Sequence, residues 1–310
     1  MPSSPSSAER PPGLIVSAPG RHVVVEDPAG GRLLCHVRGK RSEAVVGDRV
    51  RWQRSGDEGV IDEVLPRANL LYRQDEWRTK AFAANIDQLL VVVAAEPTFS
   101  ESQLARALIA AADAGVAARI LLNKRDLPAF AAARARLQPY AAMGTAIVEV
   151  ALKAERDDAR ARLAPLLAGR ATLVLGPSGA GKSTLVNLMA PAARAQTGEI
   201  SRALKSGRHT TTTTEWHWLD GARTGALIDS PGFQEFGLRH IEVERLAALM
   251  PDIAAHATAC RFYNCTHLHE PGCGVLAELD RGAIAPSRHR IYAEICEELR
   301  SRPGAPQPPR

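Results

Sequence analysis

The N-terminal part of the chain alternates between short apolar runs and turn residues. Runs rich in valine, leucine and isoleucine recur between Leu14 and Leu71, and Pro-Ala-Gly-Gly at 28–31 separates two of them. Such runs, bounded by glycine and proline, predict strands, and the turn at 28–31 predicts a hairpin. About five short strands in this stretch favour a small barrel, either an OB fold or an SH3-like barrel.

The pattern changes near residue 85, where longer apolar runs begin to alternate with helical patterns. Residues 87–94 (DQLLVVVA) form a continuous apolar run, which is typical of a parallel strand buried on both faces. Further strands are predicted at 118–122, 146–150, 171–175 and 225–228, and helices at 103–114 and 129–140. This alternation predicts a doubly wound α/β domain.

The last part of the chain is predicted to be helical and carries a cysteine cluster. A short helix is predicted at 241–250, and Ile291, Ile295 and Leu299 recur every four residues along an amphipathic helix at 286–300. We therefore expect a multidomain α/β protein. The expected divisions are a disordered tail at 1–13, the barrel at 14–71, the α/β domain at 78–238, a helical metal-binding domain at 239–300 and a second tail at 301–310.

Composition and charge narrow the range of functions. The chain has 310 residues, of which 45% are hydrophobic, and a formal net charge of +5. Its Ser/Pro-rich beginning lacks the apolar segment of a signal peptide, and its longest apolar runs are too short to span a bilayer. We therefore expect a cytoplasmic monomer without a membrane partner. The mild positive charge suits a nucleic-acid partner.

A phosphate-binding loop is predicted between a strand and a helix. Residues 176–184 (GPSGAGKST) match G-x-x-x-x-G-K-[ST] and lie between the apolar run TLVL and the helical pattern TLVNLMA. The glycines let successive backbone N–H groups point at phosphate oxygens, the lysine reaches the β- and γ-phosphates, and the serine hydroxyl ligates Mg²⁺. The predicted nucleotide-binding residues are Gly176, Pro177, Ser178, Gly179, Ala180, Gly181, Lys182, Ser183 and Thr184.

The tetrapeptide Asn123-Lys124-Arg125-Asp126, which follows the strand at 118–122, matches N-K-x-D. A carboxylate at Asp126 can accept hydrogen bonds from the N1–H and exocyclic amine of guanine, so this site would select GTP over ATP. Asn123 can bond to the base edge and hold the neighbouring loop, while the stem of Lys124 covers the ring. The alternative is that Asp126 caps a helix. Lys153, in Ala151-Leu152-Lys153, is a further candidate for contact with guanine.

Two more segments complete the predicted nucleotide site. Asp229-Ser230-Pro231-Gly232 matches D-x-x-G, in which Asp229 would hold the Mg²⁺ shell and the amide of Gly232 would sense the γ-phosphate. Upstream, residues 207–214 (GRHTTTTT) offer Thr210 or Thr211 as a further Mg²⁺ ligand.

The predicted catalytic set is Lys182, Gly232 and His209. Phe233 stands where many GTPases carry a water-orienting glutamine, so intrinsic hydrolysis should be slow. His209 is the nearest substitute for positioning water, and the alternative is a solvated loop histidine.

The order of these motifs is unusual. N-K-x-D precedes the phosphate loop, whereas ordinary GTPases begin with the phosphate loop. All these loops follow strands of one sheet, so joining the old termini and cutting the chain elsewhere leaves the site intact. The D-x-x-G segment then ends the domain, where loss of the γ-phosphate could act on the domain that follows.

A metal site is predicted in the C-terminal part. Cys260, Cys265, His267 and Cys273 supply three thiolates and one imidazole, which fit a closed, tetrahedral, structural zinc site. The alternative is three buried cysteines and a surface histidine. His269 is a spare candidate ligand. The remaining thiols, Cys35 and Cys296, are expected to be core residues.

These motifs together resemble the bacterial ribosome small-subunit-dependent GTPase A family. The resemblance rests on AANID (83–87), NKRD, GPSGAGKST, GRHTTT, DSPGF and CRFYNCTHLHEPGC (260–273). It implies an N-terminal OB-type barrel, a circularly permuted P-loop GTPase domain and a C-terminal helical domain with one structural Zn²⁺. It also implies Mg²⁺-dependent hydrolysis of GTP to GDP and phosphate, stimulated by the small ribosomal subunit during its late maturation, and rRNA binding.

The barrel carries basic residues that fit an RNA partner. They are Arg38, Lys40, Arg41, Arg49, Arg51 and Arg54. Trp52 is a candidate for stacking on a base, and the alternative is a solvated basic face with Trp52 in the barrel core.

Two other functions remain open from the sequence. The first is an RNA-binding chaperone in which GTP only gates binding, and the second is a P-loop ATPase or kinase whose N-K-x-D match is accidental. Stimulation of turnover by small subunits would separate the GTPase from the chaperone, and nucleotide selectivity would separate it from the ATPase.

Overall fold

The N-terminal strands close into a five-stranded barrel. The computed structural model describes residues 10–19, 22–38, 44–75, 79–191, 193, 213–231 and 236–301. The barrel strands run in the order β1-β2-β3-β5-β4, and β4 pairs back onto β1. This closed Greek-key arrangement confirms the predicted OB-type barrel. Its strands are β1 (Pro12–Ser17), β2 (Val23–Glu26), β3 (Arg32–Val37), β4 (Arg49–Ser55) and β5 (Glu58–Val64).

The barrel interior is apolar and includes Trp52. This side chain packs among Ile15, Val25 and Ile61, and only 8% of it is exposed. A Cβ built on Gly13 would lie 2.9 Å from the indole, so the backbone approaches the ring closely. Trp52 is therefore a core residue, and the prediction that it stacks on a base is wrong.

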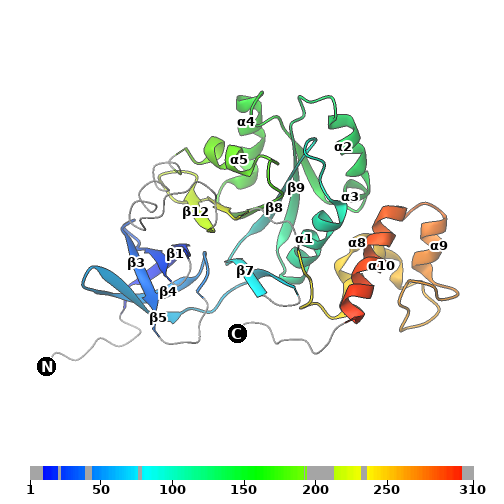
Figure 1. Ribbon diagram of the computed structural model, residues 1–310, viewed down its shortest axis with the longest axis horizontal. Helices are drawn as coiled ribbons and strands as arrows, with labels where there is room; N and C mark the ends of the chain where they lie inside the picture. The colour runs from blue at the N-terminus through cyan, green and yellow to red at the C-terminus, as the bar shows by residue number, and fades with distance from the viewer. Residues whose placement is uncertain are drawn as a thin grey trace.

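The α/β domain is built on a parallel sheet with helices on both faces (Figure 1). The strand order is β10-β9-β8-β11-β13, and β12 pairs antiparallel with β13. The strands are β8 (Gln88–Ala94), β9 (Ala117–Asn123), β10 (Ala146–Glu149), β11 (Ala171–Leu175), β12 (Glu215–Trp218) and β13 (Ala226–Asp229). The helices are α1 (Glu101–Asp113), α2 (Phe130–Arg136), α3 (Gln138–Ala142), α4 (Arg156–Leu167) and α5 (Lys182–Met189).

The continuous apolar run of β8 serves two separate cores. Leu89 and Val91 belong to the cluster that contains Leu104 of α1, whereas Leu90 and Val92 belong to the cluster of α4 and α5. Successive side chains of a strand point to opposite faces, so a strand covered on both sides needs apolar residues at every position. The sequence pattern of residues 87–94 is thus explained.

Several elements differ from the sequence prediction. The short helix expected at 241–250 is a four-residue helix at 243–246 followed by a 3₁₀ turn at 247–249. The single helix expected at 129–140 is two helices, α2 and α3, which meet at Leu137 next to Pro139. Helix α4 was not predicted, since charged residues and Pro165 interrupt its apolar pattern. A hairpin of β6 (Leu70–Gln74) and β7 (Thr79–Ala84) links the barrel to the α/β domain and was also not predicted.

Strand β12 joins the α/β sheet to the barrel. It pairs with β13 on one side and contacts β1 on the other through Ser17 and Glu215, so one eleven-stranded sheet runs through both domains. Trp218 of β12 donates a hydrogen bond from Nε1 to the buried carboxylate of Glu26, 2.7 Å away on β2.

The C-terminal part is helical and packs on the face of the sheet that carries α1 (Figure 1). Its elements are α7 (Val243–Leu246), a 3₁₀ turn at Ala247–Leu249, α8 (Pro251–Ala257), α9 (Gly274–Asp280) and α10 (Pro286–Arg300). The buried Arg288 of α10 pairs with Asp252 of α8 at 2.6 Å, and its guanidinium lies 4.8 Å from the ring centre of Tyr140 in α3. This arginine joins the C-terminal helices to the α/β domain. In the described part of the chain, no helix is long and apolar enough to cross a membrane.

Candidate nucleotide and metal sites

The phosphate loop connects β11 to α5 and depends on its glycines. Gly176 has φ +155° and Gly181 has φ +113°, a backbone conformation that side chains disfavour. A Cβ on Gly176 would collide with the carbonyl oxygen of Val92, and one on Gly181 would collide with Nδ2 of Asn123. The loop is therefore packed against the ends of β8 and β9. At its tip, Ser178 and Gly179 are exposed, as is Ser183 in the first turn of α5.

Lys182 folds back over the phosphate loop. Its Nζ donates hydrogen bonds to the carbonyl oxygens of Gly176 at 2.8 Å and Pro177 at 3.1 Å. Burial lowers the pKa of Lys182, and the nearby carboxylate of Asp229 opposes this shift. The ammonium thus lies within the loop, where it can reach phosphate oxygens.

Asp229 ends β13 beside the phosphate loop. It is 7% exposed, and its Oδ1 has no hydrogen-bond partner among the described residues. Burial raises the pKa of this carboxyl to about 6, while Lys182 opposes the rise. A buried oxygen without a partner is costly, and cation binding would satisfy it. Asp229 therefore fits its predicted place in a Mg²⁺ shell.

The side chain of Asn123 joins three loops. This residue ends β9 and is 4% exposed. Its Nδ2 donates to the carbonyl oxygen of Ala180 in the phosphate loop at 2.9 Å, and its Oδ1 accepts from the N–H of Leu152 at 3.0 Å. Of the two roles expected for Asn123, the structure shows the one in which it holds the neighbouring loops.

The other guanine candidates surround this junction. Lys124 has a positive φ of 65°, and its Nζ donates to the carbonyl oxygen of Glu96. The side chains of Asp126 and Lys153 are exposed, whereas Ala151 and Leu152 beneath Lys153 are buried. The structure thus brings the loops at 123–126, 151–153 and 176–184 to the same edge of the sheet, at the carboxyl ends of β9, β10 and β11.

Several predicted residues lie outside the described part of the chain. They are His209, Thr210, Thr211, Gly232 and Phe233 of the switch segments, and Lys40 and Arg41 of the barrel. Their roles therefore stay predictions.

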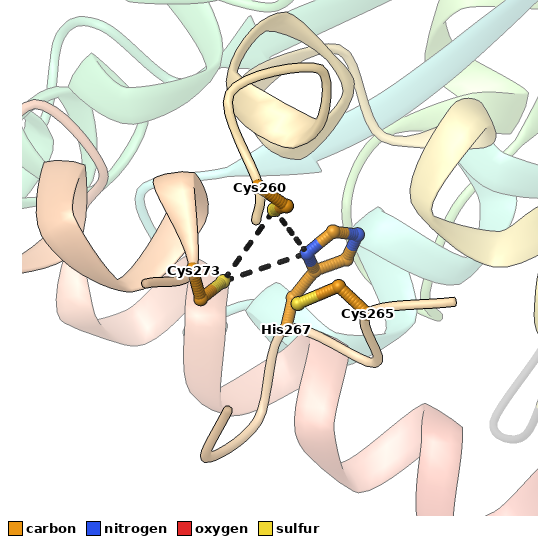
Figure 2. Close-up of side chains that lie close together, drawn as sticks. All are labelled: Cys260, Cys265, His267 and Cys273. Atoms are coloured by element: carbon orange, nitrogen blue, oxygen red, sulfur yellow. Dashed lines mark hydrogen bonds between the residues drawn. The ribbon is translucent and has the colours of Figure 1, made fainter. Parts of the chain in front are cut away.

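The four predicted metal ligands converge in the C-terminal domain (Figure 2). Their ligand atoms all lie within 4.8 Å of one another. The Sγ atoms of Cys260 and Cys273 are 3.8 Å apart, and Nδ1 of His267 lies 3.4 Å and 3.6 Å from them. Cys265 contributes the fourth ligand atom. His269 does not belong to this cluster and is exposed.

The loop that carries the cluster is held in place by hydrogen bonds. The carboxylate of Glu270 accepts from the backbone N–H groups of Thr266 and Leu268 at 2.8 Å and 3.2 Å. Tyr292 of α10 donates from its hydroxyl to the carbonyl oxygen of Thr266 at 3.0 Å. Burial raises the pKa of Cys265 to about 12, with the neighbouring sulfurs adding to the rise. A thiol binds metal as the thiolate, so a bound cation would favour ionisation of Cys265.

Two features were not predicted from the sequence, one in the C-terminal domain and one in the loop at 123–126. Phe262 and Tyr263, between two cysteine ligands, are 41% and 102% exposed and are the exposed large hydrophobic residues of the described chain. The adjacent aromatic residues in CRFYNC were a signal that could have been noticed. Arg125, at the variable position of N-K-x-D, forms ion pairs with Glu155 and Asp158, which lie 30 and 33 residues away.

The fold and the site define a class of protein. A phosphate loop and an N-K-x-D loop lie side by side on one doubly wound sheet, and the second precedes the first in the chain. This combination is that of a circularly permuted P-loop GTPase. The family model of the RsgA GTPase matches residues 64–239.

Sequence relatives agree over nearly the full length. A protein of Variovorax paradoxus, named small ribosomal subunit biogenesis GTPase RsgA, is 61% identical over 292 residues, which cover 93% of this chain and 92% of that protein. A protein of the same name from Burkholderia pseudomallei strain K96243 is 53% identical over 303 residues, which cover 96% of each. The chain belongs to the RsgA GTPase family and is a GTP hydrolase.

Solved structures give the same result. The circularly permuted GTPase YloQ is 26% identical, with a TM-score of 0.69, and the match covers 97% of this chain and 99% of YloQ. YjeQ from Thermotoga maritima is 30% identical, with a TM-score of 0.72, and the match covers 95% of this chain and 100% of YjeQ. The predicted fold class is confirmed.

Replacing Asp126 by asparagine should change nucleotide selectivity. The amide would present a donor to the N1–H and amine of guanine, so GTP should bind about 100-fold more weakly, while xanthosine triphosphate should bind better than GTP. Equilibrium titration with both nucleotides measures this change. Asp157→Asn, an exposed carboxylate in the first turn of α4, is the control and should keep the preference for GTP. Unchanged selectivity in Asp126→Asn would show that Asp126 does not select guanine.

Proposed function

We propose that this GTPase acts in late maturation of the small ribosomal subunit, and that the subunit stimulates its hydrolysis of GTP to GDP and phosphate. The proposal is supported by relatives that are 61% and 53% identical over nearly the whole chain and carry the name small ribosomal subunit biogenesis GTPase RsgA. The proposed partners are GTP, GDP and the small subunit with its rRNA, and the protein acts as a cytoplasmic monomer.

The single observation that carries the nucleotide chemistry is the pair of hydrogen bonds made by Asn123. The first joins the N-K-x-D loop to the phosphate loop and the second joins it to the segment of Lys153, which supports a single nucleotide that contacts all three segments. In this site, Asp126, Lys124 and Lys153 bind guanine, and residues 176–184 cradle the phosphates. Lys182 neutralises charge on the β- and γ-phosphates.

The remaining groups prepare the γ-phosphate for attack by water. Ser183, Asp229 and either Thr210 or Thr211 hold Mg²⁺, which when bound neutralises charge on the phosphates. The amide of Gly232 senses the γ-phosphate, and His209 orients the attacking water. Because Phe233 offers no polar group for that water, intrinsic hydrolysis is slow and the subunit supplies or arranges what is missing.

The four ligands of the C-terminal domain hold one structural Zn²⁺. A tetrahedral site with Zn–S bonds of about 2.3 Å places its sulfurs about 3.8 Å apart. The sulfurs of Cys260 and Cys273 are separated by 3.8 Å, and Gly274 donates its N–H to Cys260 at 3.3 Å, as suits a thiolate. With three sulfurs and one imidazole, the donor set favours zinc over Mg²⁺ or Ca²⁺.

RNA contacts fall on two surfaces. On the barrel, Arg49 and Arg54 are exposed, whereas Arg38 and Arg51 are partly engaged by the carboxylates of Asp62 and Glu63. Since Trp52 is buried, the barrel contributes charge but no stacking from this residue.

The aromatic contact lies in the C-terminal domain instead. Tyr263 is fully exposed, and the guanidinium of Arg261 lies 5.5 Å from the ring centre of Phe262. Exposed aromatic rings next to arginine are typical of surfaces that stack on unpaired RNA bases.

The central test measures phosphate release with and without small subunits, together with nucleotide-dependent co-sedimentation. We expect stimulation of at least about tenfold, since a partner that completes a GTPase site accelerates hydrolysis strongly. Binding without any stimulation would contradict the proposal and favour the RNA-binding chaperone in which GTP only gates binding.

Replacing Tyr263 by alanine should weaken binding to the small subunit by about tenfold, because stacking of a base on an aromatic ring contributes roughly 1–3 kcal/mol. Tyr263→Phe, which keeps the ring, should bind like the wild type. His269→Ala removes an exposed side chain of the same loop and is the matched control. Intrinsic GTP hydrolysis should be unchanged in all three variants. Equal binding by Tyr263→Ala and the wild type would exclude this contact.

Metal analysis should find one equivalent of zinc. Cys265→Ser should lose the metal and unfold the C-terminal domain, since a structural zinc contributes on the order of 10 kcal/mol in peptide models. Cys296→Ser changes a buried thiol outside the cluster and should retain the zinc. Full zinc content in Cys265→Ser, or none in the wild type, would overturn the assignment.

A further inference from the structure

The variable position of the N-K-x-D tetrapeptide carries a side chain with two partners. Arg125 donates from Nε to Oε2 of Glu155 at 2.8 Å and from Nη2 to Oδ2 of Asp158 at 3.0 Å, and Nη2 also contacts Glu155. Asp158 in turn accepts from Nε of Arg162 at 2.8 Å. These ion pairs raise the pKa of Arg125, chiefly through its hydrogen bond to Glu155. The guanidinium thus spans from the guanine loop to the first turn of α4.

The segment that carries Lys153 is fixed at both ends by residues of the tetrapeptide. Before Lys153, Oδ1 of Asn123 accepts from the N–H of Leu152 at 3.0 Å. After it, Arg125 holds the side chain of Glu155. Between these two points, Lys153 and Ala154 are exposed. The position of Lys153 relative to Asp126 therefore depends on Arg125 as well as on Asn123.

We propose that Arg125 is a positioning residue for guanine: its ion pairs with Glu155 and Asp158 hold the segment of Lys153 against the loop of Asp126. Arg125 does not touch the nucleotide in this scheme. Its effect is to set the width of the guanine pocket from one side. The inference rests on the proposed guanine contacts of Asp126 and Lys153.

The contacts also predict which property changes. The ion pairs are partly exposed, with 28% of the Arg125 side chain and 38% of the Glu155 side chain accessible, so they contribute little to folding. The backbone N–H of Arg125 still donates to the carbonyl oxygen of Val150 at 3.1 Å when the side chain is changed. Loss of the guanidinium should therefore loosen the segment of Lys153 without unfolding the domain.

The test measures nucleotide binding by Arg125→Gln, by Glu155→Gln and by the double variant that carries both changes. Each is compared with Arg162→Gln. Arg162 shares Asp158 with Arg125 but does not contact the guanine loop, so it is the matched control. We expect Arg125→Gln to bind GTP and GDP more weakly by the same factor of about three to ten, with the KM for GTP raised and kcat unchanged. The double variant should bind no worse than the weaker single variant, because both remove the same contact.

Three binding results would overturn the inference. They are nucleotide affinity in Arg125→Gln within about twofold of the wild type, additive losses in the double variant, or an equal loss in Arg162→Gln. Unfolding temperatures measured in parallel should be unchanged, and a fall that tracks the loss of affinity would assign Arg125 a merely structural role. Asp126→Asn tests the proposed guanine site separately from the role of Arg125. Only Asp126→Asn should change the preference between GTP and xanthosine triphosphate.

Discussion

The proposed nucleotide site depends on the buried amide of Asn123. Its two hydrogen bonds, to Ala180 at 2.9 Å and from Leu152 at 3.0 Å, connect the guanine loop to the phosphate loop and to the segment of Lys153. Three separate strands end at this point, and the amide adds to the backbone hydrogen bond from Arg125 to Val150, which also joins the loop at 123–126 to the start of the segment of Lys153. A buried amide that satisfies one donor and one acceptor at once fixes the spacing of these loops, and its loss would leave both partners unsatisfied.

Permutation of the chain changes what lies next to this site. Strand β12 leads from the threonine-rich segment to a pairing with β1 and a hydrogen bond to Glu26, so one neighbour of the switch region is the barrel. Beyond the D-x-x-G segment, Arg106 of α1 donates to the carbonyl oxygen of Phe236 at 3.4 Å and pairs with Glu298 of α10. The described residues before the D-x-x-G segment thus contact the barrel, and Phe236 after it contacts α1, whose Arg106 in turn pairs with the C-terminal domain.

Much of this arrangement could be predicted from the sequence, because the phosphate loop, N-K-x-D and the metal ligands are each short and contiguous. Other features could not. Burial of Trp52 depends on which face of β4 turns inward, and the apolar pattern of α4 is interrupted by Pro165 and charged residues. The contacts of Asn123 with Ala180 and of Arg125 with Glu155 join residues 57 and 30 positions apart, so only the folded sheet brings them together.

The most direct test of the role of Asn123 is to measure how Asn123→Ala binds GDP and inorganic triphosphate, which has no base. If the amide holds the phosphate loop, both ligands should bind about tenfold more weakly, since unsatisfied buried groups cost roughly 1–3 kcal/mol. If Asn123 acted only on the base edge, Asn123→Ala would bind GDP more weakly but would bind inorganic triphosphate as tightly as the wild type does. That result would contradict the account.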